Sequence, residues 1–356
     1  MSLRRHWSNT VRKAHFARYN LSPFRFSLVR RHMAQRLGSL LGLKQGFRII
    51  DLALTYSCNL TCEHCSAMVL KQSRPVLTLD DYRQIVTQAK ELDLLSWNIT
   101  GGEPLLVPWL DDLIEILEPA RHYISVQTNA MLLTPDRAER LAKLGVNCIT
   151  TSVDSIDPAE HDEFRGSIGA FDRTFEGVAN ARKAGMQILI GGTVTHQNLR
   201  SDELKQLIEK ANKVGAIFLL NVAVPCGNWA GNRDVILRDG DREYLGRLME
   251  QYPRTTTDHE VGRNAIGCPA GMEKVYITPH GEVLPCPFIH VSFGNVRDTP
   301  LTEIVAKTQK VPYFADYQKV CIAGEDPQFH TEVLDKVSAS ELPAPVPYTE
   351  IFGELN

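Results

Sequence analysis

The sequence has no long apolar run and, in its first fifty residues, no acidic side chain. No stretch of about 18 consecutive apolar residues occurs in the 356 residues, so we expect no membrane-spanning helix. The N-terminus is rich in arginine but lacks the continuous apolar core and the small-residue cleavage site of a secretory signal. With 43% hydrophobic and 23% charged residues, the composition is that of an ordinary globular protein, long enough for one large α/β domain and a smaller module.

Cysteine is scarce, and three of the eight cysteines are closely clustered. This distribution indicates metal ligands in a reducing compartment rather than a disulfide framework. We therefore expect a cytoplasmic protein.

The absence of acidic residues gives residues 1–50 a charge of +11, which leaves −14 for the rest of a chain whose net charge is −3. Apolar residues recur at helical spacing from 24 to 42 and predict a basic amphipathic helix within an N-terminal segment, 1–46. This helix either packs over the bottom of the catalytic domain, or residues 1–45 attach to an anionic membrane surface or an acidic partner. In the second case each basic residue near the surface contributes roughly 1 kcal/mol.

Strands and helices alternate between residues 47 and 227. The predicted strands are 49–55, 96–100, 123–127, 148–153, 187–194 and 217–224, and the predicted helices are 79–92, 110–117, 136–144, 171–184 and 201–214. Gly145, Gly185 and Gly215 follow three of these helices, as left-handed caps do where a chain returns to a parallel sheet. Six such units predict an α/β fold with a partial (β/α)6 TIM-type barrel, whose active site gathers at the C-terminal ends of the strands.

Three cysteines, Cys58, Cys62 and Cys65, lie within eight residues directly after the first predicted strand. One tight loop can therefore present all three thiols to one inorganic centre. A four-iron cluster held by three thiolates keeps one iron open for an external ligand, as a catalytic metal site does. The alternatives are a zinc knuckle or three incidental core cysteines.

The spacing Cys58-x3-Cys62-x2-Cys65 resembles the signature of the radical S-adenosylmethionine (SAM) enzymes. In that family the amino and carboxylate groups of SAM chelate the open iron, and an electron from the cluster cleaves the sulfonium to a 5'-deoxyadenosyl radical. The resemblance implies a 4Fe-4S cluster, SAM and an external electron donor of the flavodoxin or ferredoxin type. The family usually places an aromatic residue near the adenine, just before the third cysteine, where His64 stands here and can still stack.

Further resemblances fall where the predicted strands end. Gly101-Gly102-Glu103 looks like the family's glycine-rich motif, in which the backbone approaches the methionyl group and a carboxylate accepts from its ammonium group. Other positions similar to those that bind the cofactor or the substrate are Asn129, Ser152, Asp154, Arg165 and Asn198. Arg165 resembles a helix-entry arginine that pairs with the cofactor carboxylate. The alternative for each is loop capping or a solvated polar group.

The sixth predicted strand ends in Val224-Pro225-Cys226-Gly227. A cysteine between this proline and glycine is unusual for the family. Cys226 is either a buried structural thiol or a catalytic hydrogen-atom donor or iron ligand. Cys148, inside an apolar strand, is expected in the core.

A second module is predicted from residue 228 to residue 330. Cys268 precedes a predicted hairpin, 274–286, that ends at Cys286, and a helix follows at 301–308. This arrangement resembles the SPASM and Twitch domains, which carry auxiliary iron-sulfur clusters. A full SPASM module has more cysteines than this chain, which adds only Cys321, so we expect at most one auxiliary cluster, on Cys268, Cys286 and Cys321. Its fourth ligand is then an external group or a side chain such as His330, with Cys226 a more distant candidate.

The alternatives for this module are a Cys3His zinc site or a hairpin without a cluster. Beyond it, residues 331–356 are punctuated by prolines and predict an extended strap on the surface or, alternatively, a lid over the barrel mouth.

The resemblance implies an enzyme that cleaves SAM reductively and abstracts hydrogen from a substrate carbon, with oxidation, crosslinking and epimerisation all open. The substrate is a peptide or other natural product, or alternatively a lipid or another membrane-associated molecule, and no nucleic acid is expected. An alternative of another class is a noncatalytic iron-sulfur or zinc-binding regulatory protein.

Overall fold

A computed structural model describes residues 47–67, 69–70, 74–257 and 267–355, together with five residues between 30 and 37. The predicted N-terminal segment and its helix, 24–42, therefore lie outside the described residues apart from these five positions. One of the five, Arg31, pairs with Asp93 at 2.6 Å and donates to Arg121 O at 2.9 Å. Both partners precede strands, so Arg31 lies at the N-terminal ends of the barrel strands. No helix in the described part of the chain is long and apolar enough to cross a bilayer.

One nine-stranded sheet forms the centre of the molecule, in the order β7-β6-β5-β4-β3-β2-β1-β8-β9. Six strands pair in parallel in sequence order and confirm the predicted partial barrel: β1 (Ile49–Ala53), β2 (Ser96–Thr100), β3 (Tyr123–Gln127), β4 (Cys148–Ser152), β5 (Gln187–Val194) and β6 (Ile217–Val222). A helical segment connects each of these strands to the next, as the parallel direction requires.

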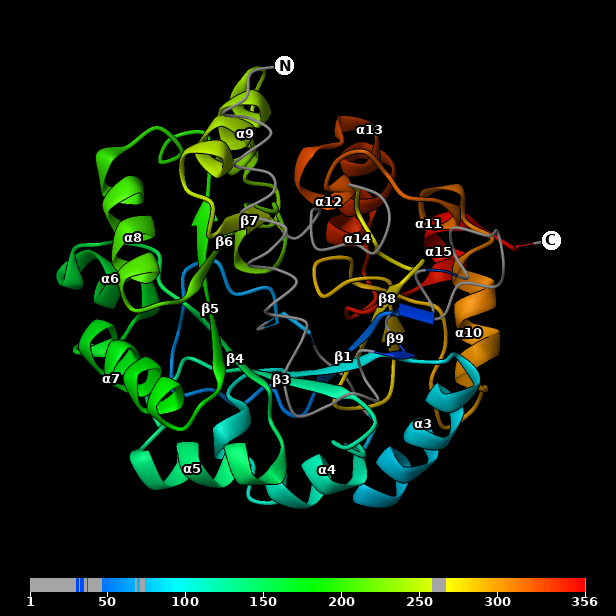
Figure 1. Ribbon diagram of the computed structural model, residues 1–356. Coiled ribbons are helices and arrows are strands. Elements are labelled where there is room, and N and C mark those ends of the chain that lie inside the picture. Colours follow the sequence, from blue (N-terminus) through cyan, green and yellow to red (C-terminus); the bar gives the residue numbers. More distant parts are fainter. Residues whose placement is uncertain are drawn as a thin grey trace.

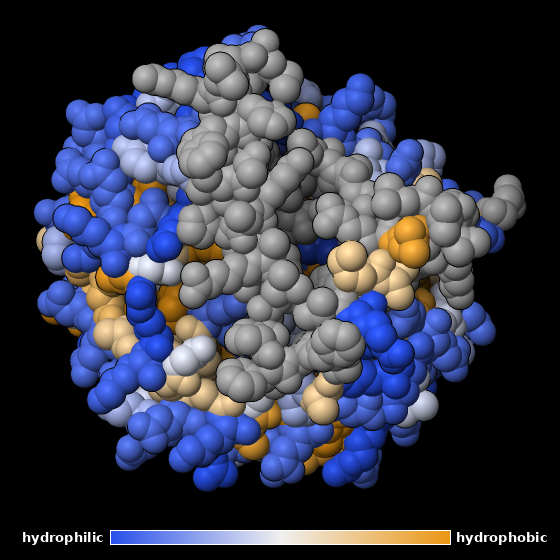
Figure 2. Space-filling view, viewed as in Figure 1, coloured by the Kyte–Doolittle hydropathy of each residue, from blue (hydrophilic) through white to orange (hydrophobic). Residues whose placement is uncertain are grey.

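A ring of helices surrounds these strands (Figure 1): α3 (Leu79–Glu91), α4 (Leu110–Ile116), α5 (Pro135–Leu144), α6 (Pro158–Arg165), α7 (Ala170–Lys183) and α8 (Asp202–Lys213). Local sequence sets their ends. Thr78 and Asp81 form a capping box at the start of α3, and Gly145 closes α5 in the left-handed conformation at φ 99°. Apart from α6, whose buried residues are His161 and Arg165, these helices bury apolar side chains in the core, while hydrophilic side chains cover most of the visible rim (Figure 2).

The sheet does not stop at the barrel. β7 (Thr255–Thr257) continues it beyond β6, and β8 (Lys274–Ile277) pairs in parallel with β1 while forming a hairpin with β9 (Val283–Leu284). The predicted hairpin is therefore confirmed, and it extends the barrel sheet at its β1 edge. The remaining part of the chain contains the helices α9 (Asp241–Gln251) and α10 (Leu301–Thr308), and α10 has its predicted bounds.

Two local expectations were wrong. Arg165 is the last residue of α6, not the first of a helix, because Gly166 in the left-handed conformation ends the helix after it. The tail is not an extended strap: residues 330–339 are helical, β11 (Val346–Pro347) pairs with β10 (Val291–Ser292), and α15 (Tyr348–Phe352) follows. Tyr348 stacks on Phe293 at 5.3 Å between ring centroids, and burial of these aromatic rings holds the tail on the second module.

Candidate active site

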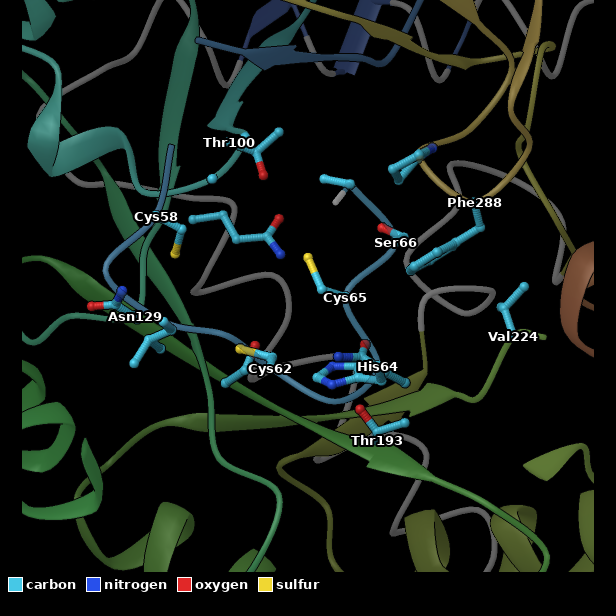
Figure 3. Close-up of a pocket in the computed structure, with 18 of the residues that line it drawn as sticks. Cys58, Cys62, His64, Cys65, Ser66, Thr100, Asn129, Thr193, Val224 and Phe288 are labelled. Atoms are coloured by element: carbon cyan, nitrogen blue, oxygen red, sulfur yellow. The ribbon is translucent and has the colours of Figure 1, made fainter. Parts of the chain in front are cut away.

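A cavity of about 230 Å³ opens at the C-terminal ends of the barrel strands. Its lining combines the cysteine loop, the strand ends and residues from the second module (Figure 3). Of the residues predicted from the sequence, these line it: Cys58, Cys62, His64, Cys65, Gly101, Gly102, Glu103, Asn129, Ser152, Arg165 and Cys226. The structure thus brings together side chains separated by up to 168 positions, numbers 58 to 226, around one space.

Glycines hold the cysteine loop in place by close contact. A Cβ on Gly102 would lie 2.2 Å from Ser57 O, and one on Gly101 (φ +131°) would lie 2.4 Å from Thr55 O. A Cβ on Gly166 or on Gly227 would meet the loop farther along just as closely, at 2.1 Å from Thr61 Oγ1 and at 2.4 Å from Cys65 O. Backbones can approach so closely only where there is no side chain. The glycine motif therefore serves first to seat the cysteine loop.

Hydrogen bonds fix both sides of the same loop. Gly102 N donates to Thr55 O at 2.6 Å, and Glu63 N donates to Phe164 O at 2.9 Å. Asn228 donates twice, through its backbone to Cys65 O at 3.1 Å and through its side chain to Cys62 O at 3.2 Å. The loop is preorganised by neighbours from three different βα connections, as a rigid ligand site requires.

Glu103 is fully buried, and its carboxylate accepts three hydrogen bonds. The donors are Thr128 Oγ1 at 2.6 Å, Asn129 N at 2.9 Å and Leu105 N at 2.9 Å. Burial raises the pKa of Glu103, and these donors oppose the rise. The carboxylate ties the end of β2 to the end of β3 and still faces the cavity.

Arg165 and Asp154 form a buried ion pair beside the cysteine loop. The Arg165 Nη2 donates to Asp154 Oδ2, and its Nη1 donates to Cys62 Sγ at 3.5 Å. Burial alone would raise the pKa of Asp154, but the guanidinium lowers it to about 2, so the carboxylate is ionised. Burial also raises the pKa of Cys62, and Arg165 opposes this. The Arg165 Nε is buried and has no hydrogen-bond partner in the described part of the chain.

His64 lies in an aromatic cluster at the edge of the cavity. Its ring stacks on Phe164 at 4.8 Å and tilts against Trp229 at 5.5 Å. Burial lowers the pKa of His64 to about 4, so the ring is neutral at physiological pH. A neutral ring in an aromatic environment is suited to stacking on a flat heterocycle.

Two predicted cofactor residues do not line the cavity. Asn198 caps its own loop, since its side chain accepts from Thr195 N at 2.9 Å and donates to Thr193 O at 2.9 Å. Asp154 lies behind Arg165 and also accepts from Thr193 N at 3.1 Å. Their contacts with a cofactor stay predictions.

Sequence reasoning missed the polar floor of the cavity. Asp51 on β1 is buried, accepts from Asn98 Nδ2 at 2.9 Å and pairs with Lys274 of β8 at 3.0 Å. Asp51 and Gln127 line the cavity, as do Thr193, Asn221 and Tyr276. A signal was present: alternate positions of the short strands, such as Asp51, Asn98 and Gln127, carry polar side chains where a filled barrel has branched apolar ones.

The second group of cysteines lies away from the cavity. Burial raises the pKa of Cys321 well above the ordinary value, and the charges of Cys268 and Cys286 raise it further, which places the three thiols in one neighbourhood. The proposed fourth ligand His330 is buried, and its Nε2 contacts Ala323 O at 2.9 Å. Cys226 is buried and close enough to Cys65 and Cys286 for their charges to raise the pKa of its thiol. Cys148 lies in the core as expected.

The loop cysteines supply the thiolates that hold an iron-sulfur cluster. The three loop thiols, the seated loop and the adjacent cavity fit a cluster with one open iron. Such a cluster with SAM supplies the radical, and the protein supplies binding and orientation.

Two family models match the chain. The radical SAM superfamily matches residues 52–211, and the SPASM iron-sulfur cluster-binding domain matches residues 268–322. The first range holds the end of β1, the cysteine loop and β2 to β5, and the second holds Cys268, Cys286 and Cys321. A SPASM domain implies auxiliary iron-sulfur clusters.

Relatives of known name cover most of the chain. The AdoMet-dependent heme synthase of Nitratidesulfovibrio vulgaris is 28% identical over 320 residues, which are 77% of this chain and 86% of the relative. The mycofactocin maturase MftC of Mycolicibacterium smegmatis is 30% identical over 263 residues, 68% of this chain and 66% of the relative.

Solved structures share the fold. Native anSMEcpe with bound AdoMet superimposes with a TM-score of 0.61 at 16% identity, over 79% of this chain and 91% of that one. Streptococcus suis SuiB bound to its precursor peptide SuiA gives 0.60 at 19% identity, over 79% and 69%. The chain belongs to the radical SAM superfamily and is an enzyme that uses a 4Fe-4S cluster and SAM, with a C-terminal SPASM domain.

Proposed function

We propose that this enzyme matures a peptide by abstracting a hydrogen atom from one of its carbons. Several relatives are named for work on peptides, including the subtilosin biosynthesis protein AlbA, PqqA peptide cyclases and mycofactocin maturases. The observation that carries the proposal is the cavity itself, which is bounded by the cysteine loop on one side and by Tyr276, Pro287 and Phe288 of the SPASM domain on the other.

The position of the cavity is compatible with a peptide. The lining includes the end of the cysteine loop and residues of the SPASM domain, so one side chain can insert beside SAM while the rest of the peptide stays outside. The polar floor, with its Asp51–Lys274 pair, carries no net charge and suits a neutral hydrogen-bonding group.

We assign roles to the residues as follows. Cys58, Cys62 and Cys65 hold the catalytic cluster, and His64 stacks on the adenine of SAM. Arg165 keeps one buried donor, Nε, for the SAM carboxylate. Glu103, with Gly101, Gly102, Asn129 and Ser152, shapes the wall beside the methionyl and ribose groups, and Cys226 remains a candidate hydrogen-atom donor.

Cys268, Cys286 and Cys321 are proposed to hold one auxiliary cluster. Their mutual electrostatic coupling supports this, and the fourth ligand is an external group, His330 or Cys226. Iron counting after anaerobic reconstitution tests the assignment: about eight irons per chain support two clusters, and about four support one.

A second candidate is synthesis of a haem, because three relatives named AdoMet-dependent heme synthase match over 76% to 86% of their own length. The peptide interpretation is preferred because the relatives named for peptide work carry several different names, whereas one name accounts for the haem relatives.

Two experiments test the proposal. Anaerobic incubation with dithionite and SAM should release 5'-deoxyadenosine. Release no higher than in a heat-treated control would refute the proposal. Peptide, porphyrin and lipid profiling of a deletion strain then decides the substrate. An accumulated unmodified peptide supports the proposal, whereas an accumulated porphyrin or lipid contradicts it.

The setting of the reaction is proposed too. A flavodoxin or ferredoxin in the cytoplasm supplies the electron, and residues 1–45, which carry nine basic side chains besides the paired Arg31 and no acidic one, make a peripheral contact with an anionic membrane. Co-sedimentation with anionic vesicles but not with neutral ones would support the contact. Equal and negligible binding to the anionic and the neutral vesicles would refute the proposed membrane contact.

A further inference from the structure

The contact between Arg165 and Cys62 is a second use of this arginine, apart from any contact with SAM. Nη1 donates to the Cys62 sulfur at 3.5 Å, while Nη2 is held by Asp154 on the other side of the guanidinium. Arg165 is 8% exposed, and the side chain of Asp154 is 7% exposed. Little water is present to screen the charge, so its field acts on the sulfur at close range.

The orientation of the pair matters because the pair as a whole is neutral. The donor edge of the guanidinium faces the sulfur, and the carboxylate lies beyond it. Asp154 is held in turn by Thr193 N at 3.1 Å, so the dipole of the pair cannot easily reverse. The positive end therefore points at Cys62.

Adding one electron to a cluster at this site makes it one unit more negative. A cation and a hydrogen-bond donor at a ligand sulfur stabilise the reduced form more than the oxidised form, and hydrogen bonds to the sulfurs are among the factors that set such potentials. The source of the electron is the external donor of the proposed function, and no other reactant is needed.

We propose that Arg165, oriented by Asp154, is a positioning residue that raises the reduction potential of the catalytic cluster through its hydrogen bond to the Cys62 sulfur. This inference rests on the proposed cluster at Cys58, Cys62 and Cys65. Burying two ions costs free energy unless they interact closely. An effect on the cluster potential would explain why the Arg165–Asp154 pair is buried next to the cysteine loop.

The test is a potentiometric titration, followed by electron paramagnetic resonance, of the reconstituted full-length enzyme without SAM. The signal that shifts on later addition of SAM identifies the catalytic cluster. Arg165→Gln should lower the equilibrium constant for its reduction by at least about tenfold, which is about 59 mV for a one-electron couple. Because SAM is absent during the titration, a lost contact with SAM cannot cause the shift.

Two further variants keep the test decisive. Arg137→Gln is the control, because Arg137 also pairs with an aspartate, Asp111, but does not line the cavity. The reduction potential of the catalytic cluster in this variant should match that of the unmodified enzyme. Arg165→Lys keeps the charge but places it on a differently shaped group, and should give a smaller fall. If Arg165→Gln cannot retain its irons, the lysine variant decides.

Unchanged potentials in the Arg165 variants, with full iron content, would overturn the inference. The proposed function would survive that result, because it predicts only that iron and 5'-deoxyadenosine release depend on the three cysteines. Conversely, if the iron content did not depend on those three cysteines, both this inference and the proposed function would be refuted.

Discussion

The two groups of cysteines are held by different kinds of structure. Cys58, Cys62 and Cys65 lie on one loop, and backbone contacts with glycines of three βα connections fix its path. Cys268, Cys286 and Cys321 are spread along the second module and meet only after the chain has folded. The first group is a local site seated in a rigid frame, and the second is a product of tertiary structure.

This difference has a chemical counterpart. The loop cysteines face the cavity, and Cys58 is exposed, as access for a second ligand requires. The module cysteines do not line the cavity, although burial raises the thiol pKa in both groups, at Cys62 as at Cys286 and Cys321. A site that binds and cleaves a cofactor needs an opening, and the loop site has one.

Replacing a loop cysteine is expected to have the largest effect. Cys65→Ala should remove about four irons per chain and abolish release of 5'-deoxyadenosine, because three thiolates are the minimum set at this site. Iron analysis and chromatography of the SAM products measure both. Cys148→Ala is the matched control: this thiol lies in the core, so its loss should leave the iron content unchanged. Iron content unchanged in Cys65→Ala as well would contradict the assignment.

Replacing a module cysteine should separate the two sites. Cys321→Ala is expected to lose the auxiliary irons but to keep reductive cleavage of SAM, while the substrate product disappears. Iron counts, 5'-deoxyadenosine release and the product are measured on the same preparation. If SAM cleavage is lost together with the product, the two cysteine sites are not independent, which contradicts the distinction between them.

The sequence was informative wherever a feature was local. The cysteine loop, the glycine motif after β2 and the hairpin of β8 and β9 were all predicted because neighbouring residues define them. The parallel pairing of Ile49 with Lys274 was not, since nothing in a hairpin sequence says which strand it will join. Arg165 was placed at the wrong end of a helix because Gly166 was not recognised as its cap.

The seating of the cysteine loop can be tested by adding one methyl group. Gly102→Ala would place a Cβ 2.2 Å from Ser57 O, so the backbone must shift. We expect a loss of about 1–3 kcal/mol of stability and a lower iron content. Gly246→Ala in α9 is the control, because its Cβ would meet nothing within 4 Å and alanine favours a helix by up to about 1 kcal/mol. Denaturant unfolding and iron analysis compare the two.

The smallest expected effect concerns an ion pair that joins the barrel to the module. Asp81 of α3 accepts from Arg297 Nη2 at 2.8 Å and from Thr78 N at 2.7 Å, and the bond from Arg297 is the main cause that lowers the pKa of Asp81 to about 2. A carboxylate whose pKa is lowered on folding adds stability above its unfolded pKa of about 3.9, and this stability is lost as the pH falls through about 2.

Asp81→Asn should therefore cost about 1–2 kcal/mol of stability, constant from pH 8 to pH 5 and shrinking below about pH 4. Asp80→Asn is the matched control on the same helix. Asp80 is well exposed and pairs with Arg83 one turn away, so its loss should change stability by less than about 0.5 kcal/mol. Denaturant unfolding across this pH range measures both. An equal effect of the two variants would mean that the contact with Arg297 adds nothing to the attachment of the module, and that the shared sheet between β1 and β8 carries it instead.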